Sequence, residues 1–298
     1  MKTETAGRGS GGMAALLTAS LVWAFSFGLI KHKLVATGLD PFFVAFVRLA
    51  LSFAIFVPFL RLKGIGAGPA VKLVLIGAIQ YGLMYATYLS AYRFLAAYEV
   101  ALFTVFTPLY VTLVNDFSAR HFDRRAFLAS LLAVAGAAFV VWTGEDRHGT
   151  LAGFALMQVS NLCFAAGQVW YGRMERRSGD TRIFALLYLG AVVTAAIPAF
   201  FSGAGHAAAL TTEQVVTLLY LGIIPSGICF FLWNAGARRA RPGRLAVMNN
   251  AKIPLAVLCS LLVFGEPADL RRLILGGSAI LAAAALCAPR LLVPTARS

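Results

Sequence analysis

Residues 182–202 read RIFALLYLGAVVTAAIPAFFS, and after Arg182 this stretch contains no charged side chain. A helix that crosses the hydrocarbon core of a bilayer needs about 20 predominantly apolar residues, and this stretch meets that requirement. The strands of a membrane barrel would instead alternate apolar and polar residues. The stretch therefore predicts a transmembrane α-helix.

The rest of the chain has the same character. Of its 298 residues, 60% are hydrophobic and 13% are charged, whereas a soluble domain is about 45–50% apolar and about 25% charged. Residues 1–12 are polar and glycine-rich, and we interpret them as a short disordered tail. The apolar runs predict an all-α polytopic membrane protein with ten spans, at residues 13–35, 41–60, 71–92, 98–117, 125–143, 150–173, 182–202, 213–236, 244–264 and 271–293.

The positions of lysine and arginine predict how these spans are oriented. Connections on the side of the N-terminus carry roughly three times as many of them as the opposite connections, which by the positive-inside rule makes that side cytoplasmic. Both termini are therefore expected in the cytoplasm, with the chain in a bacterial-type inner membrane. The same distribution explains the net charge of +14 without a nucleic-acid partner, because the cations fall at span ends.

Two segments of the chain align with each other. Thr107-Pro108-Leu109 corresponds to Ile253-Pro254-Leu255, and each proline lies inside a predicted span. Because each half, residues 13–143 and 150–293, contains five predicted spans, the second half must enter the membrane from the opposite face. Such inverted repeats are typical of secondary transporters, whose substrate site lies near the midplane between the halves. Both prolines are predicted kinks or hinges, because proline disrupts helical hydrogen bonding.

The pattern resembles the EamA branch of the drug/metabolite transporter superfamily over residues 13–292. The matching points are Trp23, Phe27, Asp40-Pro41, Arg48, Pro108, Pro254 and Gly265-Glu266. Arg120 departs from the family, which usually has an acidic residue at that position. The resemblance implies a ten-helix, 5+5 inverted-repeat fold and alternating access. It also implies a metabolite substrate, commonly an amino acid that is exported.

Polar and aromatic residues inside the spans are candidate substrate contacts, because polar groups in lipid are costly and usually face the bundle interior. The candidates are Trp23, Phe27, Gln80, Tyr81, Tyr85, Gln158, Asn161, Gln168, Trp233, Asn249, Asn250 and Lys252. For the amides of the sixth span, the alternative is hydrogen bonding between helices. For the aromatic residues, the alternatives are packing and anchoring at the membrane surface.

Two cations, Arg48 and Lys252, lie inside predicted spans and away from the span ends. An ammonium at the depth of Lys252 costs roughly 3 kcal/mol on insertion scales, so it requires an acceptor. Lys252 is a candidate for binding a substrate carboxylate, with snorkelling toward the cytoplasm or a buried ion pair as alternatives. Arg48 and Glu99 are predicted on the same side of the membrane, and we expect them to form a structural ion pair.

The motifs that are missing from the sequence exclude other functions. The chain has no H-E-x-x-H motif and no P-loop, so neither a zinc enzyme nor direct use of ATP is expected. We expect no cofactor, no metal, and a monomer or homodimer. By the resemblance, the chain is an exporter of amino acids, aromatic or neutral ones among them, and of related metabolites. The alternative is an exporter of drugs or other metabolites; a drug exporter would need an embedded carboxylate, and only Glu99 and Asp116, near span ends, are available.

Overall fold

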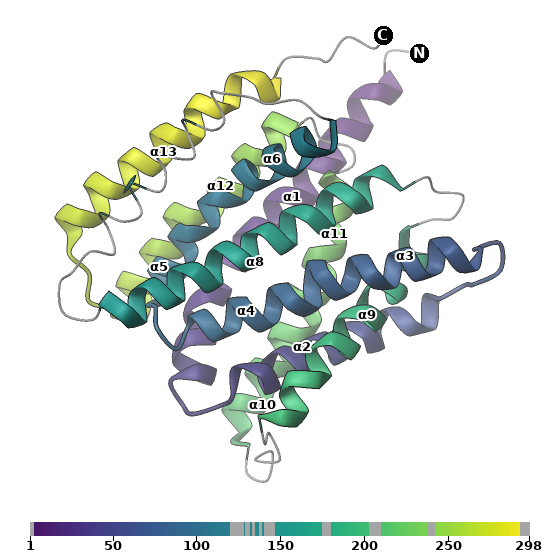
Figure 1. The fold of residues 1–298 in the computed structure, drawn as a ribbon, viewed down its shortest axis with the longest axis horizontal. Coiled ribbons are helices and arrows are strands. Elements are labelled where there is room, and N and C mark those ends of the chain that lie inside the picture. The colour runs from purple at the N-terminus through teal and green to yellow at the C-terminus, as the bar shows by residue number, and fades with distance from the viewer. Residues whose placement is uncertain are drawn as a thin grey trace.

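The computed structural model describes residues 3–119, 128, 132, 135, 136, 139, 147–174, 180–202, 210–237 and 242–292. Over these residues the ordered elements are helices, with no strand among them (Figure 1). The first part of the chain forms α1 (Thr3–Leu29), η1 (Ile30–Val35), α2 (Pro41–Phe56), η2 (Val57–Phe59), α3 (Ala67–Gly77), η3 (Ala78–Leu83), α4 (Met84–Ala91), α5 (Ala97–Phe103), η4 (Thr104–Phe106) and α6 (Thr107–Ala119). The second part forms α8 (Arg147–Arg173), α9 (Asp180–Phe201), α10 (Thr212–Leu221), η6 (Gly222–Ile228), α11 (Cys229–Ala237), α12 (Pro242–Leu258), η7 (Cys259–Val263) and α13 (Leu270–Leu292).

Seven helical stretches in the described part of the chain are long and apolar enough to cross a membrane. They are Ala14–Val35, Pro41–Phe59, Ala67–Ala91, Ala97–Phe117, Gly149–Arg173, Thr181–Phe201 and Thr212–Ala237. Each overlaps one of the predicted spans, and α12 and α13 occupy the positions predicted for the last two. Most of the predicted fifth span and Arg120 lie outside the described residues. Residues 3–12, interpreted as a disordered tail, instead belong to α1.

Several of these spans are interrupted by turns of another helix type. The segments η1, η3, η6 and η7 are π-helical, and η4 is a 3₁₀ turn that lies just before Pro108. Pro108 has no N–H to donate to the carbonyl of Thr104, so the regular ladder stops there. A change of helix type therefore accompanies Pro108. At Pro254 the helix type does not change, because α12 continues as an α-helix. A kink or hinge at either proline stays a prediction.

Two aspartates begin helices by capping them. The Oδ1 atom of Asp40 accepts hydrogen bonds from the N–H groups of Phe42 and Phe43, at 2.9 and 3.1 Å. Asp269 accepts in the same way from the first turn of α13, at 3.0 and 3.2 Å. Such bonds satisfy N–H groups that have no partner within the helix. Asp40 and Asp269 are therefore the N-caps of α2 and α13.

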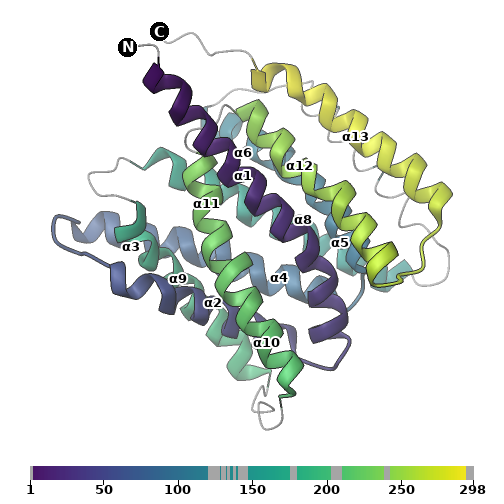
Figure 2. The same cartoon turned by 180° about the vertical axis from the view of Figure 1, so that it is seen from behind.

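Helices from the two parts of the chain pack against one another. Helix α9 lies against α2 and α3, α8 against α4 and α6, and α1 against α11 and α12 (Figures 1 and 2). The first turns of α1 and the last turns of α13 lie at the same end of the bundle in both views. The core is therefore shared between the two parts, and a site at the centre can take residues from both.

Large apolar side chains are exposed on the outside of the bundle. Phe200 and Phe201 of α9 are 83% and 81% exposed, and Leu262 of η7 is 80% exposed. Further exposed aliphatic residues follow along α9 and α13. A soluble monomer rarely exposes so much contiguous apolar surface, whereas lipid-facing helices do. The arrangement is that of a multi-pass membrane protein.

Candidate functional site

A cavity lies between helices of both parts of the chain. Its walls come from α1, α2, α4, η4, α6, α8, α11 and α12, so both parts of the chain contribute. The lining residues are Trp23, Ser26, Phe27, Arg48, Met84, Tyr85, Tyr88, Thr104, Thr107, Met157, Ser160, Asn161, Phe164, Phe230, Asn249 and Lys252. Mainly apolar walls with a few polar groups are typical of small-molecule sites.

The charges in this lining have one sign. Arg48 and Lys252 are both present, and no aspartate or glutamate occurs among the described lining residues. Arg48 is 2% exposed and Lys252 is 7% exposed. Buried charges are normally paired, because desolvation without a counter-charge is costly. The cavity is therefore suited to a ligand that brings a negative charge.

Arg48 is held in place by two hydroxyl groups. Its Nε atom donates to Oγ of Ser226 at 3.0 Å, and its Nη2 atom donates to the hydroxyl of Tyr85 at 3.2 Å. Tyr85 in turn donates to Ser226 Oγ at 2.8 Å. The predicted ion pair with Glu99 does not form, because the Glu99 carboxylate instead accepts from the N–H of Ala96 at 2.8 Å and caps α5.

The π-helical segment η6 supplies backbone acceptors behind Arg48. Pro225 in this segment has no N–H, so part of the helical ladder has no donor. Separately, side chains from other helices donate to carbonyls of this segment. Trp23 Nε1 donates to the carbonyl of Pro225 at 3.0 Å, Ser52 Oγ donates to Gly222 at 2.9 Å, and the Tyr188 hydroxyl donates to Ser226. These bonds fix α1, α2 and α9 against η6.

Lys252 lies at another part of the same cavity. Its Nζ atom donates to Oδ1 of Asn249 at 3.2 Å and lies 5.1 Å from the centre of the Trp23 ring. An aromatic face stabilises a cation at such a distance. Asn249 in turn donates from Nδ2 to the carbonyl of Thr104 at 3.3 Å. Lys252 is thus linked through Asn249 to the 3₁₀ turn η4.

Asn161 also satisfies the backbone of this turn. Its Nδ2 atom donates to the carbonyl of Phe103 at 2.8 Å, and its Oδ1 atom accepts from Thr107 Oγ1 at 3.2 Å. The N–H of Thr107 is already directed to the carbonyl of Thr104 in the 3₁₀ turn. Asn161 therefore adds a side-chain donor to the Phe103 carbonyl, at the start of the 3₁₀ turn.

Replacing Asn161 with alanine is expected to destabilise the protein by about 1–3 kcal/mol, because two buried hydrogen bonds are lost, one to the Phe103 carbonyl and one from the Thr107 hydroxyl. The measurement is the midpoint of thermal unfolding in detergent. Asn115→Ala on α6 is the matched control, because Asn115 is exposed and its contact with Arg173 lies at the surface. Equal midpoints for the two variants would contradict this role of Asn161.

The cavity brings together six of the residues predicted from the sequence to contact substrate. These are Trp23, Phe27, Tyr85, Asn161, Asn249 and Lys252. The other six, Gln80, Tyr81, Gln158, Gln168, Trp233 and Asn250, are not part of its lining.

Most of these other residues bond between helices. The indole of Trp233 donates to Oε1 of Gln168 at 3.2 Å, and the hydroxyl of Tyr110 donates to Oε1 of Gln158 at 3.2 Å. Asn234 connects Tyr81 and Gln80, because its Nδ2 donates to the Tyr81 hydroxyl at 2.7 Å and its Oδ1 accepts from Gln80 at 3.4 Å. For Gln158 and Gln168 this matches the alternative interpretation of interhelical hydrogen bonds.

The lining also includes residues outside the set predicted from the sequence to contact substrate, among them Arg48, Tyr88, Phe164 and Phe230. Arg48 had the signal that finds such residues, because a charge inside a span usually faces the bundle interior or a water-filled cavity. Tyr88 follows Tyr85 on the same helical face of α4. The phenylalanines resemble the many others in the spans, so their sequence positions carried no distinguishing signal.

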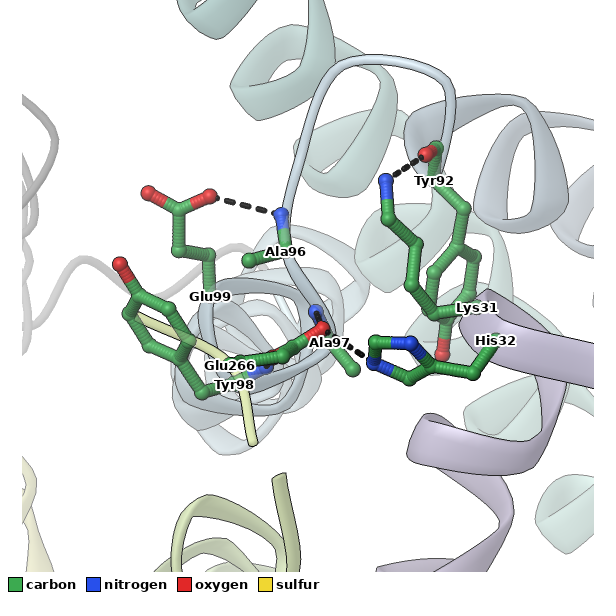
Figure 3. Close-up of polar contacts among 8 residues, drawn as sticks. All are labelled: Lys31, His32, Tyr92, Ala96, Ala97, Tyr98, Glu99 and Glu266. Carbon is green, nitrogen blue, oxygen red and sulfur yellow. Dashed lines mark hydrogen bonds and ion pairs between the residues drawn. The ribbon is translucent and has the colours of Figure 1, made fainter. Parts of the chain in front are cut away.

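Glu266 joins three distant segments near one end of the bundle (Figure 3). Its Oε1 atom accepts from the N–H of Ala97 at 2.9 Å, and its Oε2 atom accepts from the N–H of Tyr98 at 3.1 Å. The imidazole of His32, on η1, lies 3.0 Å from Oε1. The connection between η7 and α13 is thereby bound to the start of α5 and to the end of the first span.

Lys31 extends these contacts on the other side of His32. Its Nζ atom donates to the carbonyl of Tyr92 at 2.7 Å, which ties η1 to the end of α4 (Figure 3). The His32 ring also stacks on Phe264, with centroids 5.1 Å apart and an interplanar angle of 10°. Polar contacts and ring stacking together hold this end of the bundle.

The family model for the EamA-like transporter family matches the chain twice, over residues 10–142 and 151–288. The chain belongs to this family. The resemblance inferred from the sequence is confirmed, and the protein is a membrane transporter. The gap between the two matches, after residue 142 and before residue 151, falls where the sequence predicts the boundary between two related halves.

Curated relatives match nearly the whole length of this EamA-like transporter. The biotin transporter of Salmonella typhimurium is 36% identical over 273 residues, which are 91% of each chain. The biotin transporter of Escherichia coli strain K12 is 37% identical over 273 residues, again 91% of each. A probable biotin transporter of Pseudomonas aeruginosa is 36% identical over 274 residues, 91% of this chain and 95% of the relative. These names do not support the amino-acid specificity that the resemblance implies.

A solved crystal structure has the same fold as this EamA-like transporter. The TM-score is 0.65 with 20% sequence identity, and the match covers 94% of this chain and 98% of the other. At this identity the likeness concerns the fold alone.

Proposed function

We propose that this EamA-like protein is a secondary transporter of biotin. It crosses the inner membrane ten times as two inverted halves of five spans, works by alternating access, and has both termini in the cytoplasm. The observation that carries the proposal is a central cavity with apolar aromatic walls and two cations that no acid in the described lining balances. The relatives named as biotin transporters support the choice of substrate.

The chemistry of biotin is complementary to this cavity. Biotin has a compact bicyclic ring with a ureido group and a thioether, and an aliphatic chain that ends in a carboxylate. The ring and chain fit against Trp23, Phe27, Phe164 and Phe230, which lie in the lining. Hydroxyl and amide side chains in the same lining can bond the ureido group, and the cations balance the carboxylate.

The same cavity disfavours amino acids and cationic drugs. A zwitterionic amino acid carries an ammonium as well as a carboxylate, and that ammonium would lie near Arg48 and Lys252 without an acid in the described lining to balance it. A cationic drug would meet the same repulsion with no compensating attraction. The charge distribution therefore favours a monocarboxylate over both expected alternatives.

The test is flux of labelled biotin into liposomes that contain the purified protein and no ATP. We expect saturable biotin uptake that unlabelled biotin inhibits and that neutral amino acids leave unchanged. Empty liposomes provide the background. Flux of an amino acid or a cationic dye without flux of biotin would refute the proposal. Liposomes that are loaded with labelled biotin inside measure efflux, which is transport in the opposite direction.

A further inference from the structure

We propose that the guanidinium of Arg48, and not the ammonium of Lys252, is the group on which the substrate carboxylate docks. This rests on the proposed function and names the residue that determines specificity for the charged end of the substrate. Tyr85 and Ser226 are positioning residues, because they act through Arg48. From the sequence, Lys252 was the candidate for binding the carboxylate and Arg48 was expected to be structural. Here Arg48 takes the role expected of Lys252.

Arg48 is fixed before any ligand binds. One edge of its guanidinium, formed by Nε and Nη2, is occupied by Ser226 and Tyr85. The guanidinium carbon lies 4.8 Å from the centre of the Tyr85 ring, which adds a stacking contact. A guanidinium held this way loses little conformational freedom when a ligand binds. The free energy of ligand binding is therefore not spent on ordering the Arg48 side chain.

The other end of the Arg48 guanidinium carries a donor without a hydrogen-bond partner among the described residues. This donor is Nη1, which is buried. An unpaired buried donor is costly, and the cost is greater for a charged group. A carboxylate can accept two parallel hydrogen bonds from the end of a guanidinium fork. Binding a carboxylate therefore removes an unfavourable feature of the empty cavity.

Lys252 already has partners of its own. Its Nζ atom donates to Asn249, which is held by the carbonyl of Thr104, and it lies against the face of Trp23. A carboxylate that docked on Lys252 would compete with these contacts. Lys252 instead contributes positive potential to the cavity, which attracts an anion without fixing its orientation.

The experiment compares biotin with biotinamide, whose neutral carboxamide replaces the carboxylate, as inhibitors of labelled biotin flux. In the unaltered protein we expect biotin to inhibit about 10–100-fold more strongly than biotinamide, because a charge-assisted bond contributes about 1.5–3 kcal/mol. In Arg48→Gln this ratio should fall to near one. In Tyr85→Phe and Ser226→Ala it should fall part of the way, because Arg48 remains but is less well oriented.

Lys252→Gln is the discriminating control. Whatever its effect on both affinities, it should retain the preference for biotin over biotinamide. A lost preference in Lys252→Gln with a retained one in Arg48→Gln would overturn the proposal. If Arg48→Gln yields no folded protein, Arg48→Lys takes its place; it keeps the charge but not the fork, and an unchanged ratio in that variant would likewise overturn the proposal.

The outcomes also separate this proposal from the proposed function. Absence of biotin flux in the unaltered protein would refute the function. Normal biotin flux with an undiminished preference in Arg48→Gln would refute only the role of Arg48.

Discussion

Replacing Gly77 with leucine should leave almost no folded protein. At this position α3 crosses α9 with the two backbones in direct contact, and a Cβ atom on Gly77 would lie 1.8 Å from the carbonyl oxygen of Leu187. The backbone of α9 approaches α3 equally closely, because a Cβ on Gly190 of α9 would lie 1.9 Å from the carbonyl oxygen of Val74. Overpacking against side chains costs about 1–3 kcal/mol, and backbone atoms can give way less than side chains can.

The control for Gly77→Leu is available in the same helix. Nothing lies within 4 Å of a Cβ on Gly68, so Gly68→Leu adds the same side chain without a clash. The measurement is the yield of monodisperse protein after detergent extraction, followed by size-exclusion chromatography. A Gly77→Leu peak as large as that of Gly68→Leu would show that α3 and α9 do not meet in this way. Close backbone contact through small residues is a common way to pack helices in lipid, where no hydrophobic force draws them together.

Replacing Glu266 with alanine should destabilise the protein by about 2–4 kcal/mol, because two backbone N–H groups at the start of α5 lose their acceptor. The carboxylate of Glu266 is buried and bonds the N–H groups of Ala97 and Tyr98 as well as His32. Glu266→Gln should have an intermediate effect, since one oxygen remains to accept while the amide N–H₂ opposes the other backbone donor. The measurement is the thermal unfolding midpoint in detergent.

Glu213→Ala is the control for Glu266→Ala. Glu213 also forms an ion pair, with Lys33 at 2.7 Å, but its side chain is 63% exposed. Exposed pairs contribute about 0–1 kcal/mol, so this variant should resemble the unaltered protein. If both glutamate variants unfold at the same temperature, the contacts at Glu266 do not stabilise this end of the bundle.

Much of the fold could be predicted because lipid imposes a simple rule. Every backbone polar group in a span needs an internal partner, so an apolar run such as residues 182–202 can only be a helix. The break at Pro108 was predictable for a related reason, since proline removes a backbone donor. Pro254 has the same chemistry but lies in an uninterrupted α-helix. The proline motif by itself therefore does not predict where the helix type changes.

The site was predicted less well because the orientation of each span could not be read from its composition. Tyr81 and Tyr85 share a face if α-helical periodicity applies. In the structure Tyr81 lies within the π-helical segment η3, which holds more residues per turn, and only Tyr85 reaches the cavity. Arg48 was assigned to Glu99 because both lie on one side of the membrane, yet its helix turns it toward Ser226.

The acceptors in η6 are main-chain atoms, and this determines where selection can act. No substitution within Gly222–Ile228 removes the carbonyls that Trp23, Ser52 and Tyr188 bind. These carbonyls persist through substitutions in η6 as long as its backbone keeps the π-helical path. Ser226 is the exception, because its side-chain hydroxyl accepts from Arg48 and Tyr85. The donors to the carbonyls are side chains, so a substitution of Trp23, Ser52 or Tyr188 removes the bond itself.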